Sequence, residues 1–273
     1  YGRVLVLVAA ALPVGVAAGA ADALFGRVLL AVSGVRAGWP LLTVPFLAVA
    51  GALTAWAYRC FGKGTERGMG LVFGAAHGQD QQIPLRLVPL VMVSTWLTHL
   101  TGGSAGREGV AVQIGATLSH WLGRRLPLRD AAPTFAVVGM AAGFAGLFRT
   151  PLAATVFALE VLAAGRLRYE ALAPALAASL VASATSGALG LAKFEVAVAP
   201  LAALDAPVTL RLALAGLAFG VAGGAFAWLL SRGKSVAARL LPNPVARAAA
   251  MGAGLSAVLL VLWGGRYCGL GTN

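Results

Sequence analysis

The stretch Gly102-Gly103-Ser104-Ala105-Gly106-Arg107-Glu108-Gly109-Val110 places a single carboxylate among glycines at the predicted start of an apolar helix. Apart from Arg107 and Glu108, the sequence from Leu87 to Gly123 contains no Asp, Glu, Lys or Arg. Ionisable residues are costly in such apolar surroundings, and those that occur there usually serve a function. Glycine also lets the backbone approach a ligand closely. Glu108 is therefore predicted to be a functional carboxylate.

The composition is that of an integral membrane protein. Hydrophobic residues make up 59% of the chain and charged residues 11%, and the mean hydropathy is +0.86, far from the values of soluble domains. A helix needs about 20 apolar residues to span a bilayer. The charge-free stretches near that length are continuous rather than alternating, which excludes a transmembrane β-barrel. They are Val4–Ala21, Ala37–Tyr58, Leu87–Gly106, Ala131–Phe148, Ala171–Ala192, Leu212–Ser231 and Ala248–Gly265.

The net charge of +12 reflects topology rather than nucleic-acid binding. Basic residues fall between the apolar stretches, as is usual for cytoplasmic loops and headgroup contacts, and attraction of anions is a secondary possibility. The loops alternate too weakly to assign an orientation. Cys60 and Cys268 lack the spacing of a metal site, so neither a metal, a cofactor nor a disulfide is predicted.

The order of apolar stretches and helix breakers predicts an all-α protein with two related parts. Two long apolar helices lead to Gly68-Met69-Gly70, and two more lead to Gly269-Leu270-Gly271. Transporters often consist of inverted halves whose short, glycine-interrupted helices meet at mid-membrane. We therefore expect residues 1–200 to form a first inverted repeat and residues 201–273 to begin a second. Because the chain starts at Tyr1 with no signal peptide and stops soon after this second motif, a longer reading frame is expected.

The expected helices follow from the same breakers. The first, Val4–Val35, is expected as one long helix or a broken pair. A short helix is expected to begin near Gly68. The others are Leu41–Phe61, Pro84–Thr101, Glu108–Leu122, Ala131–Leu147, Pro151–Ala164, Tyr169–Ser186, Val208–Leu230 and Pro244–Trp263.

Two of these helices begin with glycine-rich sequence suited to holding an anion. A helix N-terminus presents unpaired N–H groups and the positive end of the helix dipole. Glu108 stands at such a terminus, where its carboxylate could compete with an anion for the same donors and withdraw once protonated. The alternative is a structural ion pair with Arg107 or a loop arginine, although adjacent residues diverge on a helix.

The motifs resemble the CLC family of anion channels and proton-coupled antiporters. The resemblance rests on Gly106-Arg107-Glu108-Gly109 after Gly102-Gly103-Ser104, and on Gly139-Met140-Ala141-Ala142-Gly143-Phe144 and Thr150-Pro151-Leu152-Ala153 downstream. It implies a polytopic bundle of tilted and broken helices, built from two inverted repeats per subunit and assembled as a homodimer. The small residues within Pro151–Ser186 would make that stretch a dimer face, because they permit close helix packing.

Three features are similar to the fluoride-exporting branch of that family. Val110 stands where chloride-type members carry proline, and Thr95-Trp96-Leu97-Thr98-His99-Leu100 precedes the motif. Met69 stands in the region of the anion-coordinating serine of chloride and nitrate members. Glu160-Val161 offers one carboxylate where many chloride/proton antiporters have two, which implies that protons do not use a separate internal route. Glu160 is then expected to be structural, as a helix cap or in a pair with Arg166 or Arg168.

The resemblance implies fluoride export coupled to proton import, with Glu108 as gate and proton carrier. The anion would be held by Ser104, Gly106, Arg107, Gly109 and Val110 and, opposite them, by Gly68, Met69 and Gly70. The alternative is a chloride channel or chloride/proton antiporter of the same family. The partners are then fluoride or chloride, protons, membrane lipid and a second copy of the chain, in a cell membrane, most simply a bacterial inner membrane.

Other interpretations have weaker support in the sequence. Methionine on a short apolar helix is usually a space-filler. His99 could relay protons or make an interhelical hydrogen bond. No common catalytic motif is present, so an intramembrane hydrolase built on His99 with Ser94 or Ser104 would be fortuitous. A purely structural membrane subunit would not require Arg107 and Glu108 between glycines.

Overall fold

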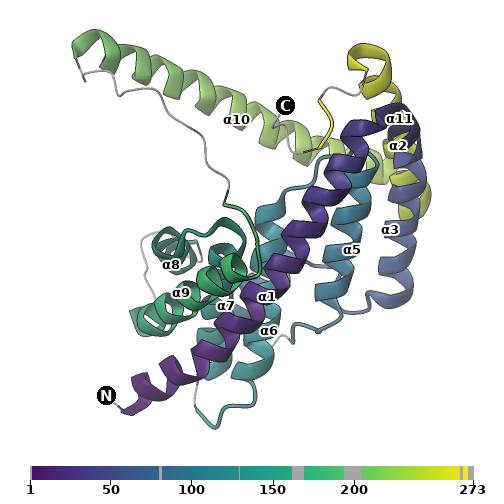
Figure 1. The fold of residues 1–273 in the computed structure, drawn as a ribbon. Coiled ribbons are helices and arrows are strands. Elements are labelled where there is room, and N and C mark those ends of the chain that lie inside the picture. The colour runs from purple at the N-terminus through teal and green to yellow at the C-terminus, as the bar shows by residue number, and fades with distance from the viewer. Residues whose placement is uncertain are drawn as a thin grey trace.

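The protein folds into a bundle of helices of very different lengths (Figure 1). The computed structural model describes residues 2–79, 82–128, 130–161, 169–193, 205–264 and 267–269. Within these ranges all regular structure is helical, which confirms the all-α prediction. Six helices in the described ranges are long and apolar enough to cross a membrane.

The helices begin and end close to the predicted breakers. They are α1 (Gly2–Gly38), α2 (Pro40–Thr43), the 3-10 turn η1 (Val44–Phe46), α3 (Leu47–Phe61), α4 (Met69–Ala76), α5 (Leu87–Leu100), α6 (Arg107–Gly123), α7 (Ala131–Phe148), α8 (Pro151–Glu160), the 3-10 turn η2 (Tyr169–Ala171), α9 (Leu172–Ala188), α10 (Ala206–Leu240) and α11 (Pro244–Trp263).

The two N-terminal stretches differ from each other in continuity. Of the two forms expected for the first stretch, the structure has the single continuous helix, in which Pro13 lies inside α1. Membrane helices tolerate such a proline because neighbouring groups satisfy the freed carbonyl. The second stretch is interrupted, since Pro40 begins α2 and Pro45 lies in the first turn of η1 before α3 continues. The helix predicted over 41–61 is therefore confirmed in extent as the span Pro40–Phe61, with a 3-10 turn in its first part.

Glycines set the closest helix contacts in the core. Gly115 of α6 faces Gly139 and Gly143 of α7, and a Cβ on any of the three would collide with backbone atoms of the other helix. Gly15 and Gly19 also bring α1 close to the backbone of α9. Small residues allow this approach, which compensates for the lack of a hydrophobic driving force inside a bilayer. The core is centred on α7, and 78% of the residues in its apolar span are buried.

The C-terminal helices join the bundle through α3. Gly51 of α3 lies against Ala248 of α11, and Gly252 of α11 lies against Leu47 and Ala48. The hydroxyl of Ser256 donates to the Val44 carbonyl at 2.9 Å. By contrast, α10 has no buried residue and extends away from the bundle (Figure 1).

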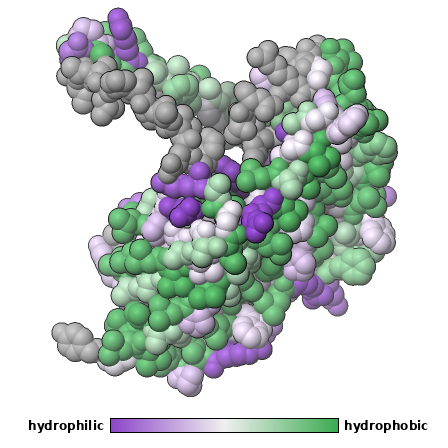
Figure 2. Space-filling model, viewed as in Figure 1, coloured by the Kyte–Doolittle hydropathy of each residue, from purple (hydrophilic) through white to green (hydrophobic). Residues whose placement is uncertain are grey.

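Much of the molecular surface is apolar. Figure 2 shows hydrophobic side chains over most of the face that α1 crosses, with hydrophilic residues in small groups. In α8 and α9 the small residues Ala154, Ala175 and Ala178 are fully buried inside the subunit. The exposed residues of these helices include both small and large apolar ones, among them Ala153, Ala173, Leu152 and Leu180. Ala154, Ala175 and Ala178 therefore pack within the chain, whereas Ala153 remains on the surface.

Two helix ends differ clearly from the prediction, those of α8 and α10. Helix α8 ends at Glu160 rather than Ala164, and residues 162–168, with Arg166 and Arg168, lie outside the described residues. Thr150 is the N-cap of α8, but its side chain makes no capping hydrogen bond. Helix α10 continues past Leu230 to Leu240. The expected repeat boundary near residue 200 also falls in a range that the structure does not describe.

Candidate functional site

The segment between α5 and α6 forms a tight glycine turn that leads into an open helix start. Gly103 donates its N–H to the Thr98 carbonyl at 2.9 Å, and Gly102 has a φ of 87°, a conformation that favours glycine. Gly106 is the extended N-cap of α6 and provides no side-chain acceptor. The first N–H groups of α6 therefore have no side-chain cap at this position and can bind a ligand.

Glu108 lies in the first turn of α6 with its side chain exposed. Its Oε2 would be 3.0 Å from a Cβ at Gly106, so the carboxylate folds back over the glycine N-cap. No ion pair holds Glu108 anywhere in the described ranges, which argues against the structural pair with Arg107. The guanidinium of Arg107 instead lies 5.2 Å from the centre of the Phe148 ring.

Helix α4 begins after its own glycine turn. The Gly64 N–H donates to the Glu66 carboxylate at 3.0 Å, and the pKa of that carboxyl is lowered by a bond from the N–H of Glu66 itself and by this one. Gly68 is the N-cap of α4, with a φ of 49° and no side-chain cap. Met69 and Gly70 are the first two residues of the helix.

The structure brings the two predicted helix starts together. A Cβ on Gly109 would lie 3.9 Å from Cγ of Met69, and one on Gly68 would lie 3.6 Å from Oε1 of Gln113. The Gln113 amide is fixed by donating to the Gly109 carbonyl at 3.0 Å. Gly68 and Met69 of α4 thus lie against the first two turns of α6. Val110 points into the core and is 7% exposed, so it shapes the site through packing.

The other side of the glycine turn contacts the segment that follows α11. The hydroxyl of Ser104 donates to the Gly269 carbonyl at 2.7 Å. The guanidinium of Arg36, at the end of α1, packs on Gly269, since a Cβ there would lie 2.8 Å from Nη2. Ser104 therefore ties the turn to the second glycine motif.

Three residues near the site were not predicted from the sequence: Arg36, Gln113 and Phe148. Arg36 and Phe148 are far from Glu108 along the chain, so only the fold brings them to Gly269 and to Arg107, respectively. Gln113 is four residues after Gly109, and that helical spacing is a usable signal for their hydrogen bond. The predicted interhelical hydrogen bond of His99 is not formed among the described residues, because His99 bonds the Ala105 carbonyl in the adjacent turn at 2.9 Å.

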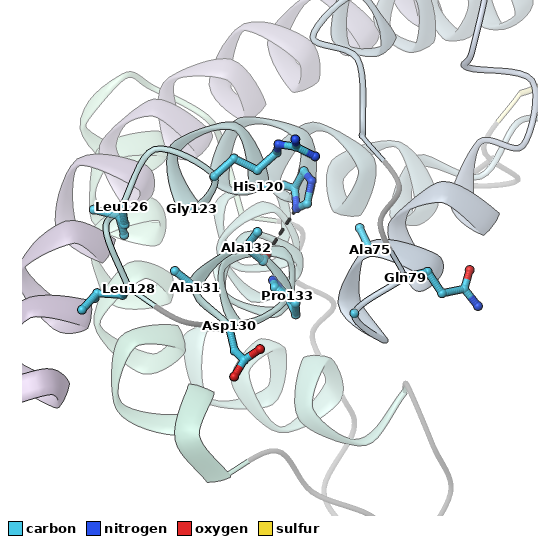
Figure 3. Close-up of a pocket in the computed structure, with 12 residues that line it drawn as sticks. Ala75, Gln79, His120, Gly123, Leu126, Leu128, Asp130, Ala131, Ala132 and Pro133 are labelled. Carbon is cyan, nitrogen blue, oxygen red and sulfur yellow. Dashed lines mark hydrogen bonds between the residues drawn. The ribbon is translucent and has the colours of Figure 1, made fainter.

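A polar pocket lies at the C-terminal end of α6. It has a volume of about 330 Å³ and is lined by His120, Asp130 and the first residues of α7. In Figure 3 the His120 ring points toward Ala132, whose carbonyl it approaches to 3.2 Å, while Asp130 points away. Since Glu108 and His120 lie at opposite ends of α6, this pocket is separate from the candidate anion site.

Comparison with known proteins identifies the fold and family. The family model described as the voltage-gated chloride channel matches residues 50–273. The chain belongs to the CLC family. A crystal structure of a CLC-type fluoride/proton antiporter is similar over 100% of this chain and 69% of that chain, with a TM-score of 0.95 and 46% identity. A slow cyanobacterial Cl⁻/H⁺ antiporter shares the CLC fold, with a TM-score of 0.77 and 21% identity over 93% of this chain and 63% of that chain.

Curated CLC relatives cover part of the sequence. A chloride/fluoride channel protein of Pseudomonas syringae pv. tomato is 37% identical over 215 residues, which are 78% of this chain and 47% of that protein. The voltage-gated ClC-type chloride channel ClcB of Salmonella typhimurium is 28% identical over 179 residues, 64% of this chain and 43% of that protein. The chain thus spans about half the length of these CLC relatives. The family and the apolar helices make it a multi-pass membrane protein.

Proposed function

We propose that the intact protein exports fluoride across a membrane in exchange for protons, with Glu108 as the gate and proton carrier. The observation that carries this proposal is the position of Glu108, a carboxylate without an ion pair in the described ranges, at the glycine-capped N-terminus of α6. Similarity to a CLC-type fluoride/proton antiporter at 46% identity favours fluoride as the anion. The alternative is a chloride channel or chloride/proton antiporter of the same family.

The chemistry follows from competition for one set of donors. The N–H groups at the start of α6 can stabilise either a halide or the Glu108 carboxylate. A proton on Glu108 removes its negative charge and its need for those donors, so a fluoride ion can take its place. Loss of the proton restores the carboxylate and expels the anion. Proton and anion binding are then linked at one residue.

The surroundings of Glu108 suit a small anion. Ser104, Gly106, Arg107 and Gly109 shape one side of the site, and Gly68, Met69 and Gly70 shape the other. Arg107 also lines a small cavity of about 170 Å³ with Lys193, and two cations facing one hollow raise the local anion concentration. Met69 presents a thioether in place of a hydroxyl donor, which disfavours a site tuned to chloride.

We also propose that the protein is a homodimer built from inverted repeats. We expect a homodimer in a bacterial inner membrane, with residues 1–200 as a first inverted repeat and residues 201–273 as the start of a second. Helices α3 and α11 each come second before a glycine motif, and they pack closely through Gly51 and Gly252, which supports this division. Exposed apolar residues such as Leu152 and Leu180 suit a subunit contact.

Halide efflux from liposomes tests the anion. The intact protein, reconstituted into vesicles loaded with fluoride, is expected to release it on addition of a proton carrier, as followed with a fluoride electrode. An equal concentration of chloride should compete weakly. Equal competition by chloride would favour the alternative, and no halide efflux at all would favour a structural subunit or a hydrolase.

Met69→Ser is expected to raise chloride flux relative to fluoride flux. The serine hydroxyl adds one hydrogen-bond donor beside Gly109, and a net hydrogen bond of about 1 kcal/mol corresponds to roughly fivefold. Chloride and fluoride efflux are measured on the same vesicle preparation. Met92→Ser, which changes a buried methionine of α5, serves as the control. An unchanged flux ratio in Met69→Ser would remove Met69 from the selectivity site.

A further inference from the structure

His99 lies directly beside the glycine turn that leads into α6. It belongs to the last turn of α5 and is 0% exposed. One ring nitrogen, Nε2, is 2.9 Å from the carbonyl oxygen of Ala105. A carbonyl oxygen can only accept, so Nε2 must carry the proton and donate it. The contact therefore fixes the Nε2–H tautomer of the ring.

The second ring nitrogen gives the same assignment. Nδ1 of His99 is buried and has no hydrogen-bond partner among the described residues. A proton on Nδ1 would leave a buried donor unsatisfied, which is costly. A neutral imidazole with a bare Nδ1 fits this environment, which makes His99 a hydrogen-bond donor and not a proton relay.

The bond to Ala105 sets the direction of a neighbouring N–H group. A peptide unit is planar and trans, so the Ala105 C=O and the Gly106 N–H point in opposite directions. Because the Ala105 carbonyl points at buried His99, the Gly106 N–H points away from that ring. The Glu108 carboxylate folds back over the same glycine, with Oε2 3.0 Å from the position that a Gly106 Cβ would take.

We propose that His99 is a positioning residue for the anion site, which aims the Gly106 N–H at the bound anion by holding the Ala105 carbonyl. This inference rests on the proposed function and deepens it. The glycine turn has little rigidity of its own, since glycine restricts the backbone least. One buried side-chain donor thus orders a flexible segment at the point where the anion and Glu108 compete.

A set of substitutions separates positioning from simple packing. Glutamine places an amide N–H where the histidine Nε2–H lies, asparagine is too short to do so, and leucine fills the volume without a donor. His99→Gln is expected to keep the fluoride-to-chloride flux ratio within about twofold of the unaltered protein. His99→Asn and His99→Leu are expected to lower that ratio by about tenfold. His77→Gln, a change in an exposed histidine at the end of α4, is the control.

Two outcomes would overturn the inference. If His99→Leu keeps the ratio, the residue only fills space, and if His99→Gln loses it as fully as His99→Asn, the Nε2 donor is not what matters. A measurement without transport distinguishes these from failure of the proposed function. The ¹⁵N spectrum of histidine-labelled protein, assigned with His77→Gln and His120→Gln, is expected to show His99 neutral and protonated at Nε2. A neutral ring protonated at Nδ1 would contradict the positioning role whatever the protein transports.

Discussion

Glu108→Gln is expected to abolish the dependence of fluoride movement on the proton gradient. Glutamine is uncharged like the protonated carboxyl, so it cannot alternate between binding a proton and competing for the α6 N–H groups. Fluoride uptake into vesicles driven by a pH gradient should fall by at least about tenfold, which corresponds to about 1.4 kcal/mol of lost coupling. A fluoride electrode and a pH indicator in the same vesicles measure both ions.

The matched control is Glu170→Gln. Glu170 is exposed and lies 3.9 Å from Arg3 in a surface ion pair, and such pairs contribute little. Its removal is expected to leave pH-driven uptake unchanged. If Glu108→Gln also takes up fluoride in response to the pH gradient at the unaltered rate, Glu108 is not the proton carrier.

Gly115→Val is expected to cause the largest loss of stability. The Gly115 position faces the backbone of Gly139 and Gly143, where even a Cβ would collide with main-chain atoms. Backbone cannot move aside as a flexible side chain can, so α6 and α7 would have to separate. Overpacking of this kind costs about 3 kcal/mol or more, and the protein is expected to denature at a markedly lower temperature in detergent or not to fold.

Gly34→Val makes the same chemical change where the structure has room. Gly34 lies in α1, and no atom lies within 4 Å of the position that its Cβ would take. The stability of this variant then changes only through the small difference in helix propensity between glycine and valine. The denaturation temperature of this variant is expected to stay close to that of the unaltered protein. Equal stability of the two variants would show that α6 and α7 do not pack through Gly115.

The helices could be predicted from the sequence because their ends carry strong local signals. Pro151 and Pro244 begin helices, and Gly62 and Gly264 follow the ends of others, as expected from backbone geometry. Pro13 shows the limit of such signals, because packing around α1 tolerates a residue that ends helices in water.

The candidate site was predictable only in part. Its glycines and Glu108 stand out because charge and backbone freedom are unusual in an apolar sequence. The pairing of Met69 with the α6 start was expected only from the resemblance to CLC proteins, and the structure places Met69 beside Gly109. His99 stood out in the sequence, but its hydrogen bond to Ala105 was not predicted. The contact of Arg36 with Gly269 was not predictable, because only the fold brings the end of α1 there. Asp22, fully buried beside Gly146, also gave no signal beyond its charge.

The binding of fluoride as a function of pH tests the central claim most directly. If the anion and the Glu108 carboxylate compete for one place, titration calorimetry should show the Kd for fluoride falling as the pH is lowered, with a proton taken up for each anion bound. Glu108→Gln should bind fluoride with a Kd that no longer depends on pH. A pH-independent Kd in the unaltered protein, or the same pH dependence in both proteins, would contradict the account.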